Sequence, residues 1–135
     1  MTRRIPARTA VRGFLALLFL ASGILHLAMP APYRRIVPAY FPAPALLVAV
    51  SGWAEIIGAI GLLVPRTRGL AAWGLMLLLV AVFPANVEML RLYREAGASW
   101  WSESLLWLRL PLQLLLILAV WRVSRAERPD SSASA

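Results

Sequence analysis

The sequence predicts an all-α fold, a four-helix transmembrane bundle. Hydrophobic residues make up 61% of the 135 residues and charged residues only 15%, whereas soluble domains are about half apolar and a quarter charged. The mean hydropathy is +0.73. A span needs roughly 20 predominantly apolar residues, and runs of about this length occur at residues 13–29, 45–64, 70–87 and 105–121.

The distribution of arginine predicts the orientation of the spans, because cytoplasmic segments carry an excess of positive residues. All fourteen basic residues are arginines. Nine flank the spans on the side of the chain ends: Arg3, Arg4, Arg8, Arg12, Arg66, Arg68, Arg122, Arg125 and Arg128. Four lie on the other side: Arg34, Arg35, Arg91 and Arg94. We therefore expect both termini in the cytoplasm. This topology accounts for the net charge of +8, and no nucleic-acid partner is expected.

The first span, residues 13–29, follows a basic cytoplasmic arm at residues 1–12. A secretory signal with a small-residue cleavage site near Gly23 is the alternative. However, the apolar run continues past Gly23, and cleavage would leave the two chain ends on opposite sides of the membrane. We expect a retained span that carries His26, the only histidine, near its outer end.

The connection at residues 30–44 contains five prolines and cannot sustain a long regular helix. We expect an outer loop that lies on the bundle, with a short helical turn at residues 32–37. Its aromatic residues are expected at the level of the lipid headgroups: Tyr33, Tyr40 and Phe41.

The second span, residues 45–64, carries Glu55 near its centre. An ionisable side chain at that depth costs about 2.5–3.5 kcal/mol on insertion scales and is a functional-site hypothesis by default. Small residues that favour close helix packing are Gly52, Gly58 and Gly61. The spacing in Ser51-Gly-x-x-Glu55 matches that in Ser22-Gly-x-x-His26, but from two matches we infer no repeat.

A short turn at residues 65–69 makes the second and third spans antiparallel neighbours. The third span, residues 70–87, contains Pro84, which frees a backbone carbonyl and is expected to bend the helix near its outer end. Asn86 and Glu88 close the span at that end.

The fourth span, residues 105–121, carries Arg109 and Gln113, which share one helix face because they are four residues apart. Residues 123–135 have little apolar content to bury and are expected to form a disordered cytoplasmic tail.

Polar side chains of the four spans are expected to meet in the outer half of the bundle, because a helix rises 1.5 Å per residue. The candidate ligand-binding or proton-relay residues are His26, Glu55, Asn86, Glu88, Arg109 and Gln113. Arg109 is the expected counter-ion of Glu55, with Glu88 as the competing partner. Two interpretations remain: the cluster only holds the helices together, or it also receives a ligand or a proton.

The chain has no cysteine and a single histidine. These counts exclude thiol redox relays as well as a histidine-rich metal cage or a two-histidine haem site within one chain. We therefore assign no catalytic residue, no metal ligand and no resident cofactor, and we do not expect an autonomous enzyme.

A set of motifs occurs in order between residues 13 and 122: Gly23-x-x-His26, Tyr33-x-x-Ile36-Val-Pro38 leading to Pro42, Ser51-Gly52-x-x-Glu55-x-x-Gly58-x-x-Gly61, and Phe83-Pro84-Ala85-Asn86. With these motifs the sequence resembles the DoxX-like family of small four-span bacterial membrane proteins. The resemblance implies a multi-pass protein of the bacterial cytoplasmic (inner) membrane. It also implies, through some relatives, a link to a thiosulfate:quinone oxidoreductase or to membrane redox complexes.

We therefore expect a non-autonomous subunit of a quinone-linked redox assembly, with a small polar pocket that receives a quinone. Electrons would come from a partner subunit. The alternative is a non-catalytic carrier, ligand-binding protein or assembly factor in contact with membrane lipids. A channel or ion-coupled transporter is least favoured, because the bundle offers no continuous polar path.

Overall fold

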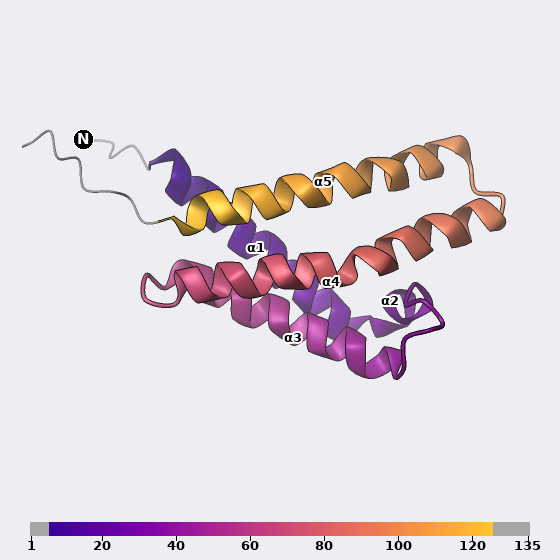
Figure 1. Ribbon diagram of the computed structural model, residues 1–135, viewed down its shortest axis with the longest axis horizontal. Helices are drawn as coiled ribbons and strands as arrows, with labels where there is room; N and C mark the ends of the chain where they lie inside the picture. Colours follow the sequence, from indigo (N-terminus) through magenta and orange to yellow (C-terminus); the bar gives the residue numbers. More distant parts are fainter. Residues whose placement is uncertain (1–5, 126–135) are drawn as a thin grey trace, which may run out of the picture.

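The computed structural model describes residues 6–125 and contains five helices and no strand in that range (Figure 1). The helices are α1 (Ala7–Ala28), α2 (Pro30–Arg35), α3 (Pro44–Leu63), α4 (Arg68–Glu95) and α5 (Trp100–Ser124). All but α2 are long and apolar enough to cross a membrane. The predicted all-α fold with four candidate spans, as in a multi-pass membrane protein, is confirmed.

The four long helices run antiparallel in chain order, so α1 begins and α5 ends at the same end of the bundle (Figure 1). We call this the terminal end, and we call the opposite end, which carries α2 and the α4–α5 turn, the α2 end. The expected short helical turn after the first span is observed as α2, displaced slightly toward the N-terminus of the chain. Proline at its first position has no N–H to leave unpaired, which suits a helix start.

The helices extend beyond the apolar runs that predict them. α1 begins at Ala7, inside the expected basic arm, and α4 continues to Glu95. Ion pairs on the surface of α4, from Arg91 to Glu88 and Glu95, support its charged last turns. The helix ends where Gly97 adopts a positive φ of 70°, a backbone conformation that glycine adopts without strain. Of the expected disordered tail, the first two residues belong to α5 and residues 126–135 lie outside the described range.

Close approach of α1 to α3 depends on two glycines. A Cβ atom on Gly23 would lie 2.5 Å from the backbone oxygen of Gly52, and one on Gly52 would lie 2.9 Å from the Cβ of His26. Further along α3, Gly58 contacts Leu75 of α4 in the same way. A Cβ atom on Gly61 would lie 2.6 Å from the Cβ of Ala71. The expected role of Gly52, Gly58 and Gly61 in close packing is therefore confirmed.

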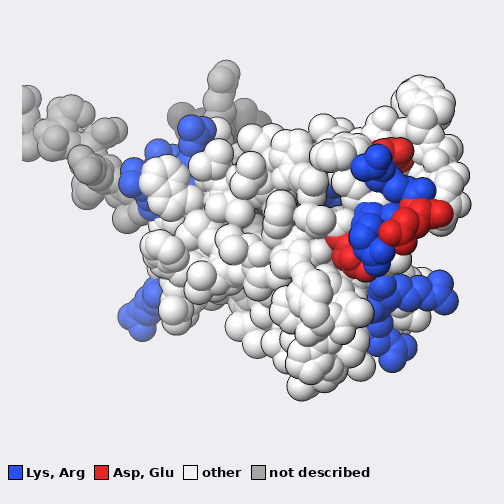
Figure 2. Space-filling view, turned by 45° about the vertical axis from the view of Figure 1, so that its right-hand side comes forward, with Lys and Arg blue, Asp and Glu red and all other residues white. Residues whose placement is uncertain are grey.

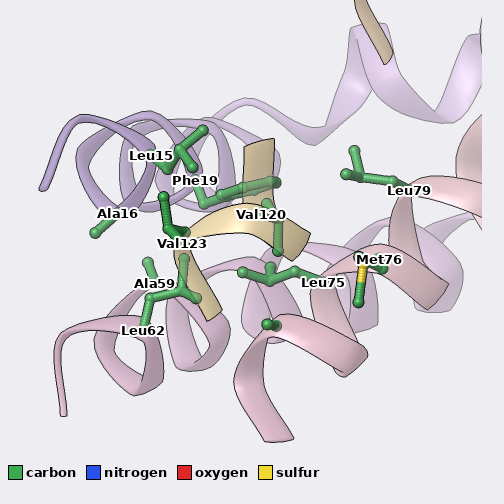
Figure 3. Close-up of a cluster of buried hydrophobic side chains, with 11 residues drawn as sticks. Leu15, Ala16, Phe19, Ala59, Leu62, Leu75, Met76, Leu79, Val120 and Val123 are labelled. Carbon is green, nitrogen blue, oxygen red and sulfur yellow. The ribbon is translucent and has the colours of Figure 1, made fainter. Parts of the chain in front are cut away.

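The hydrophobic core fills the terminal-end half of the bundle (Figure 3). Its members come from all four long helices: Leu15, Ala16, Phe19, Ala59, Leu62, Ala72, Leu75, Met76, Leu79, Val120 and Val123. Many other large apolar side chains point outward, among them Phe14, Leu17, Trp73, Leu77 and Leu114. On the face shown in Figure 2, charged side chains gather at the two ends, and the wide band between them is almost free of charge.

The terminal-end half of the bundle also contains a buried charged side chain. Arg12 is only 7% exposed, and its Nη2 donates a hydrogen bond to the carbonyl oxygen of Val123 at 3.3 Å. This carbonyl lies in the last turn of α5, where backbone oxygens have no partner within the helix and the helix dipole favours a cation. The sequence placed Arg12 in the arm because the apolar run starts after it.

Candidate functional site

A pocket of about 480 Å³ lies in the α2-end half of the bundle. Such a volume is in the range of small-molecule sites, which run from about 300 to 1,000 Å³ and are mostly apolar with a few convergent polar groups. Its apolar walls include Leu18, Phe41, Val48, Leu78, Leu112 and Leu116. Its polar lining consists of Ser22, His26, Tyr33, Ser51, Glu55, Asn86, Arg109 and Gln113.

The carboxylate of Glu55 is held by α1. The hydroxyl of Ser22 donates to Oε1 at 3.1 Å, and Nδ1 of His26 lies 3.2 Å from Oε2. These contacts are possible because the facing glycines let α1 and α3 approach closely at this level. The expected pairing of Glu55 with Arg109 is therefore wrong: depth alone suggested Arg109, but the helix packed against Glu55 is α1.

His26 is fixed by two further contacts. Its Nδ1 lies 2.8 Å from the carbonyl oxygen of Ser22, one turn earlier in α1. Because a carbonyl can only accept, Nδ1 carries the hydrogen, and Nε2 remains for another partner. The ring stacks on that of Tyr33 from α2, with the centroids 3.9 Å apart. The short helix therefore covers the histidine and contributes to the pocket wall.

One oxygen of the acid lacks a donor. Oε2 of Glu55 is buried and makes no hydrogen bond of proper geometry in the described part of the chain, since the Nδ1 hydrogen of His26 points to the Ser22 carbonyl. A buried acceptor without a donor is destabilising by roughly 1–3 kcal/mol, and more when charged. A donor brought by a ligand would satisfy it.

On the opposite wall, α4 and α5 are joined by two side-chain amides. Nδ2 of Asn86 donates to Oε1 of Gln113 at 2.6 Å, and Nε2 of Gln113 donates to the backbone oxygen of Leu79. Gln113 is only 4% exposed. Leu79 lies five residues before Pro84, which is inside α4, and α4 is bent along its length in Figure 1. Gln113 thus ties α5 to the backbone of α4 beside the expected proline bend.

Arg109 lies at the edge of the pocket. Its side chain is exposed, and its Nη1 lies 3.5 Å from the sulfur of Met89. It also lines a second pocket nearer the α2 end of the molecule. The guanidinium therefore stands between the two pockets and does not neutralise Glu55.

Glu88 lies outside the pocket and does not compete for Arg109. Both of its oxygens accept hydrogen bonds from Arg91, at 2.6 and 2.9 Å, on the surface of α4. The other five candidate residues all line the pocket: His26, Glu55, Asn86, Arg109 and Gln113.

Sequence reasoning missed three polar residues of the site: Ser22, Tyr33 and Ser51. Ser22 is the hydrogen-bond donor to Glu55, and its four-residue spacing from His26 already placed both on one face of α1. Tyr33 was assigned to the lipid headgroup level, and no sequence pattern indicated that it stacks on His26. Among residues 6–125, no group of three or more histidine, aspartate or glutamate side chains is arranged to hold a metal ion.

Comparison with known proteins gives one match. The sequence profile of a family described as a domain of unknown function (DUF8561) matches residues 15–124, which covers nearly all of the four long helices and every residue of the pocket. Neither the curated proteins nor the solved structures yield a match.

Proposed function

Because this chain belongs to the DUF8561 family, whose description assigns no activity, we propose a function from the geometry: it binds an apolar small molecule with an oxygen-bearing head. The observation that carries the proposal is the pocket of about 480 Å³ in which an acid, a histidine and an arginine stand among leucines. The apolar walls suit a hydrocarbon or ring system, and the polar groups suit its oxygens.

We place the site in the outer half of the bacterial inner membrane, with the chain ends in the cytoplasm. Support comes from the excess of arginine at the terminal end, which the positive-inside bias assigns to the cytoplasm. With this orientation the pocket is open to molecules that dissolve in the outer leaflet.

A quinone is the ligand class that fits these groups best, and the resemblance to DoxX-like proteins points the same way. The guanidinium of Arg109 and, when protonated, Nε2 of His26 are donors for the two carbonyl oxygens of such a ring. Glu55 would accept or release a proton as the bound molecule changes its protonation. In this proposal the chain is a subunit of a redox assembly, and electrons come from a partner subunit.

The second candidate is a non-catalytic carrier or assembly factor. This candidate is favoured by the hydrogen bond from Gln113 to the backbone of α4, because it shows that at least one polar residue of the pocket holds helices together. In that case the pocket would store or present an apolar molecule without any change in its oxidation state.

Binding of decylubiquinone to the purified protein in lipid nanodiscs tests the proposal. We compare the wild type with Glu55→Gln, which removes the charge but keeps the size, and with Glu88→Gln as a control outside the pocket. The pocket variant should bind the reduced form, the quinol, about tenfold more weakly, because a quinol hydroxyl group can donate to the Glu55 carboxylate and this hydrogen bond to a charged group is lost. Equal affinity in all three proteins, or none in the wild type, would reject the quinone.

The two candidates differ in a second measurement. If the protein is a redox subunit, membranes that carry Glu55→Gln should reduce or oxidise quinone more slowly than wild-type membranes with the same amount of protein. If it is a carrier, the rate stays unchanged while binding is lost.

A further inference from the structure

A second pocket, of about 510 Å³, lies at the α2 end of the molecule and is not used by the proposed function. It is formed by α2, by the last turns of α4 and by Arg109 of α5. Two arginines and two tyrosines line it among apolar side chains: Arg35, Arg109, Tyr33 and Tyr93, with Pro32, Ile36, Met89, Leu92 and Ala96. No carboxylate is part of its lining.

The arginines of this second pocket differ from the two ion-paired arginines of α4. Arg91 is paired with Glu88 and Glu95, and Arg94 with Glu103, at N···O distances of 2.6–3.0 Å. The carboxylates of Glu88, Glu95 and Glu103 are thus already in ion pairs with Arg91 and Arg94. Within residues 6–125, neither guanidinium of the second pocket is within ion-pair distance of a carboxylate. On the face shown in Figure 2, acidic and basic side chains intermingle at the right-hand end, and a separate basic group lies beside them.

We expect the second pocket at the depth of lipid headgroups. α4 has 28 residues and is about 42 Å long at 1.5 Å per residue, longer than a hydrocarbon core of about 30 Å. Its last turns, which line the pocket, therefore extend beyond the core. Figure 1 shows the α4–α5 hairpin reaching further toward the α2 end than the start of α3.

We propose that the second pocket binds the phosphate of an anionic phospholipid, with Arg35 and Arg109 as the cationic donors. Arginine suits phosphate because its planar fork donates two parallel hydrogen bonds, and basic pockets beside transmembrane helices hold anionic headgroups. The phenol groups of Tyr33 and Tyr93 offer two more donors. The apolar side chains of Ile36 and Leu92 suit the glycerol and the first methylenes of a lipid better than a hydrated free ion.

The charge of the site selects among phospholipids. Two guanidinium groups without a carboxylate favour a headgroup with a net negative charge, such as phosphatidylglycerol. A zwitterionic headgroup would bring its ammonium group close to these cations, which is unfavourable.

Arg35 lines only the second pocket, and Glu55 only the first, so the two sites can be tested separately. Native mass spectrometry of the protein released from mixed micelles measures how many phosphatidylglycerol or phosphatidylcholine molecules it retains. Arg35→Gln is compared with Arg34→Gln, a matched control that removes the same charge from the neighbouring residue outside the pocket.

The wild type should retain one phosphatidylglycerol in preference to phosphatidylcholine. Arg35→Gln should weaken this binding about tenfold, in line with the loss of a charge-assisted hydrogen bond, and Arg34→Gln should not. Equal weakening in both variants would show that only the general surface charge acts and would overturn the site. So would equal retention of the two lipids.

Two controls keep the result interpretable. Inorganic phosphate at millimolar concentration should not displace the lipid; if phosphate alone displaces it fully, the site takes a free anion and the lipid assignment is wrong. Decylubiquinone binding to Arg35→Gln reports on the fold and on the first pocket. Unchanged quinone binding together with lost lipid binding supports the second site, whatever the outcome of the Glu55→Gln experiment.

Discussion

Replacing Gly23 by alanine tests how α1 and α3 position the acid and the histidine. The new Cβ would lie 2.5 Å from the backbone oxygen of Gly52 and 2.8 Å from Cγ1 of Ile56. A backbone oxygen cannot rotate away, and a carbon atom normally lies about 3.3–3.6 Å from such an oxygen. The two helices must therefore separate by roughly 1 Å at this level.

The separation has two energetic consequences. Overpacking of a well-packed contact destabilises by about 1–3 kcal/mol. The hydrogen bond from Ser22 to Glu55, now 3.1 Å long, would be stretched beyond its useful range, and such a bond contributes about 0.5–1.5 kcal/mol. We therefore expect Gly23→Ala to lose roughly 2–4 kcal/mol of stability from these two effects.

Gly13 of the same helix supplies the matched control, because a Cβ there would meet no atom within 4 Å. Gly13→Ala should be neutral or stabilising by up to about 1 kcal/mol, since alanine is the better helix former. The assay is reversible unfolding in mixed micelles followed by helical circular dichroism, together with decylubiquinone binding. If Gly23→Ala is as stable as Gly13→Ala and binds quinone equally well, the close approach of α1 and α3 does not position the site.

Three further substitutions probe other parts of the bundle. Gln113→Leu removes the acceptor of the Asn86 amide and the donor to the backbone oxygen of Leu79 and should lower stability by about 1–3 kcal/mol. An unchanged melting temperature would mean that water or a new contact replaces these bonds. Arg12→Met keeps much of the side-chain length but removes the hydrogen bond to the last turn of α5. Amide hydrogens in that turn should therefore exchange faster with deuterium. Equal exchange in the variant and the wild type would contradict a capping role. Gly97→Ala places a Cβ on a residue with positive φ and should lower the free energy of unfolding by about 1–2 kcal/mol. The same unfolding assay measures this loss, and unchanged stability would show that the turn relaxes.

The four long helices could be predicted because hydrophobicity over about 20 residues is sufficient to identify a span. Their ends could not, since α4 continues to Glu95 through charged residues that pair with one another on its surface. A hydropathy scale scores each residue separately and does not account for ion pairs between residues. The same limitation placed Arg12 in an arm, although its guanidinium is buried against α5.

That five of the six candidate residues line one pocket could be predicted from depth, because polar side chains at one level of a small bundle converge. The partner of Glu55 could not, because depth does not say which helix is adjacent. The information was present in the matched spacing of Ser22-Gly-x-x-His26 and Ser51-Gly-x-x-Glu55: their glycines are the point where α1 and α3 meet. Small residues at matching positions would have indicated His26 as the partner.

The hydrogen bond between Arg12 and the last turn of α5 connects two helices that lie far apart in the sequence. Because α1 is synthesised before α5, the guanidinium cannot meet the carbonyl oxygen of Val123 until α5 has been made. The same helix brings Arg109 and Gln113 to the pocket. A nascent chain that stops before α5 therefore lacks one wall of the pocket.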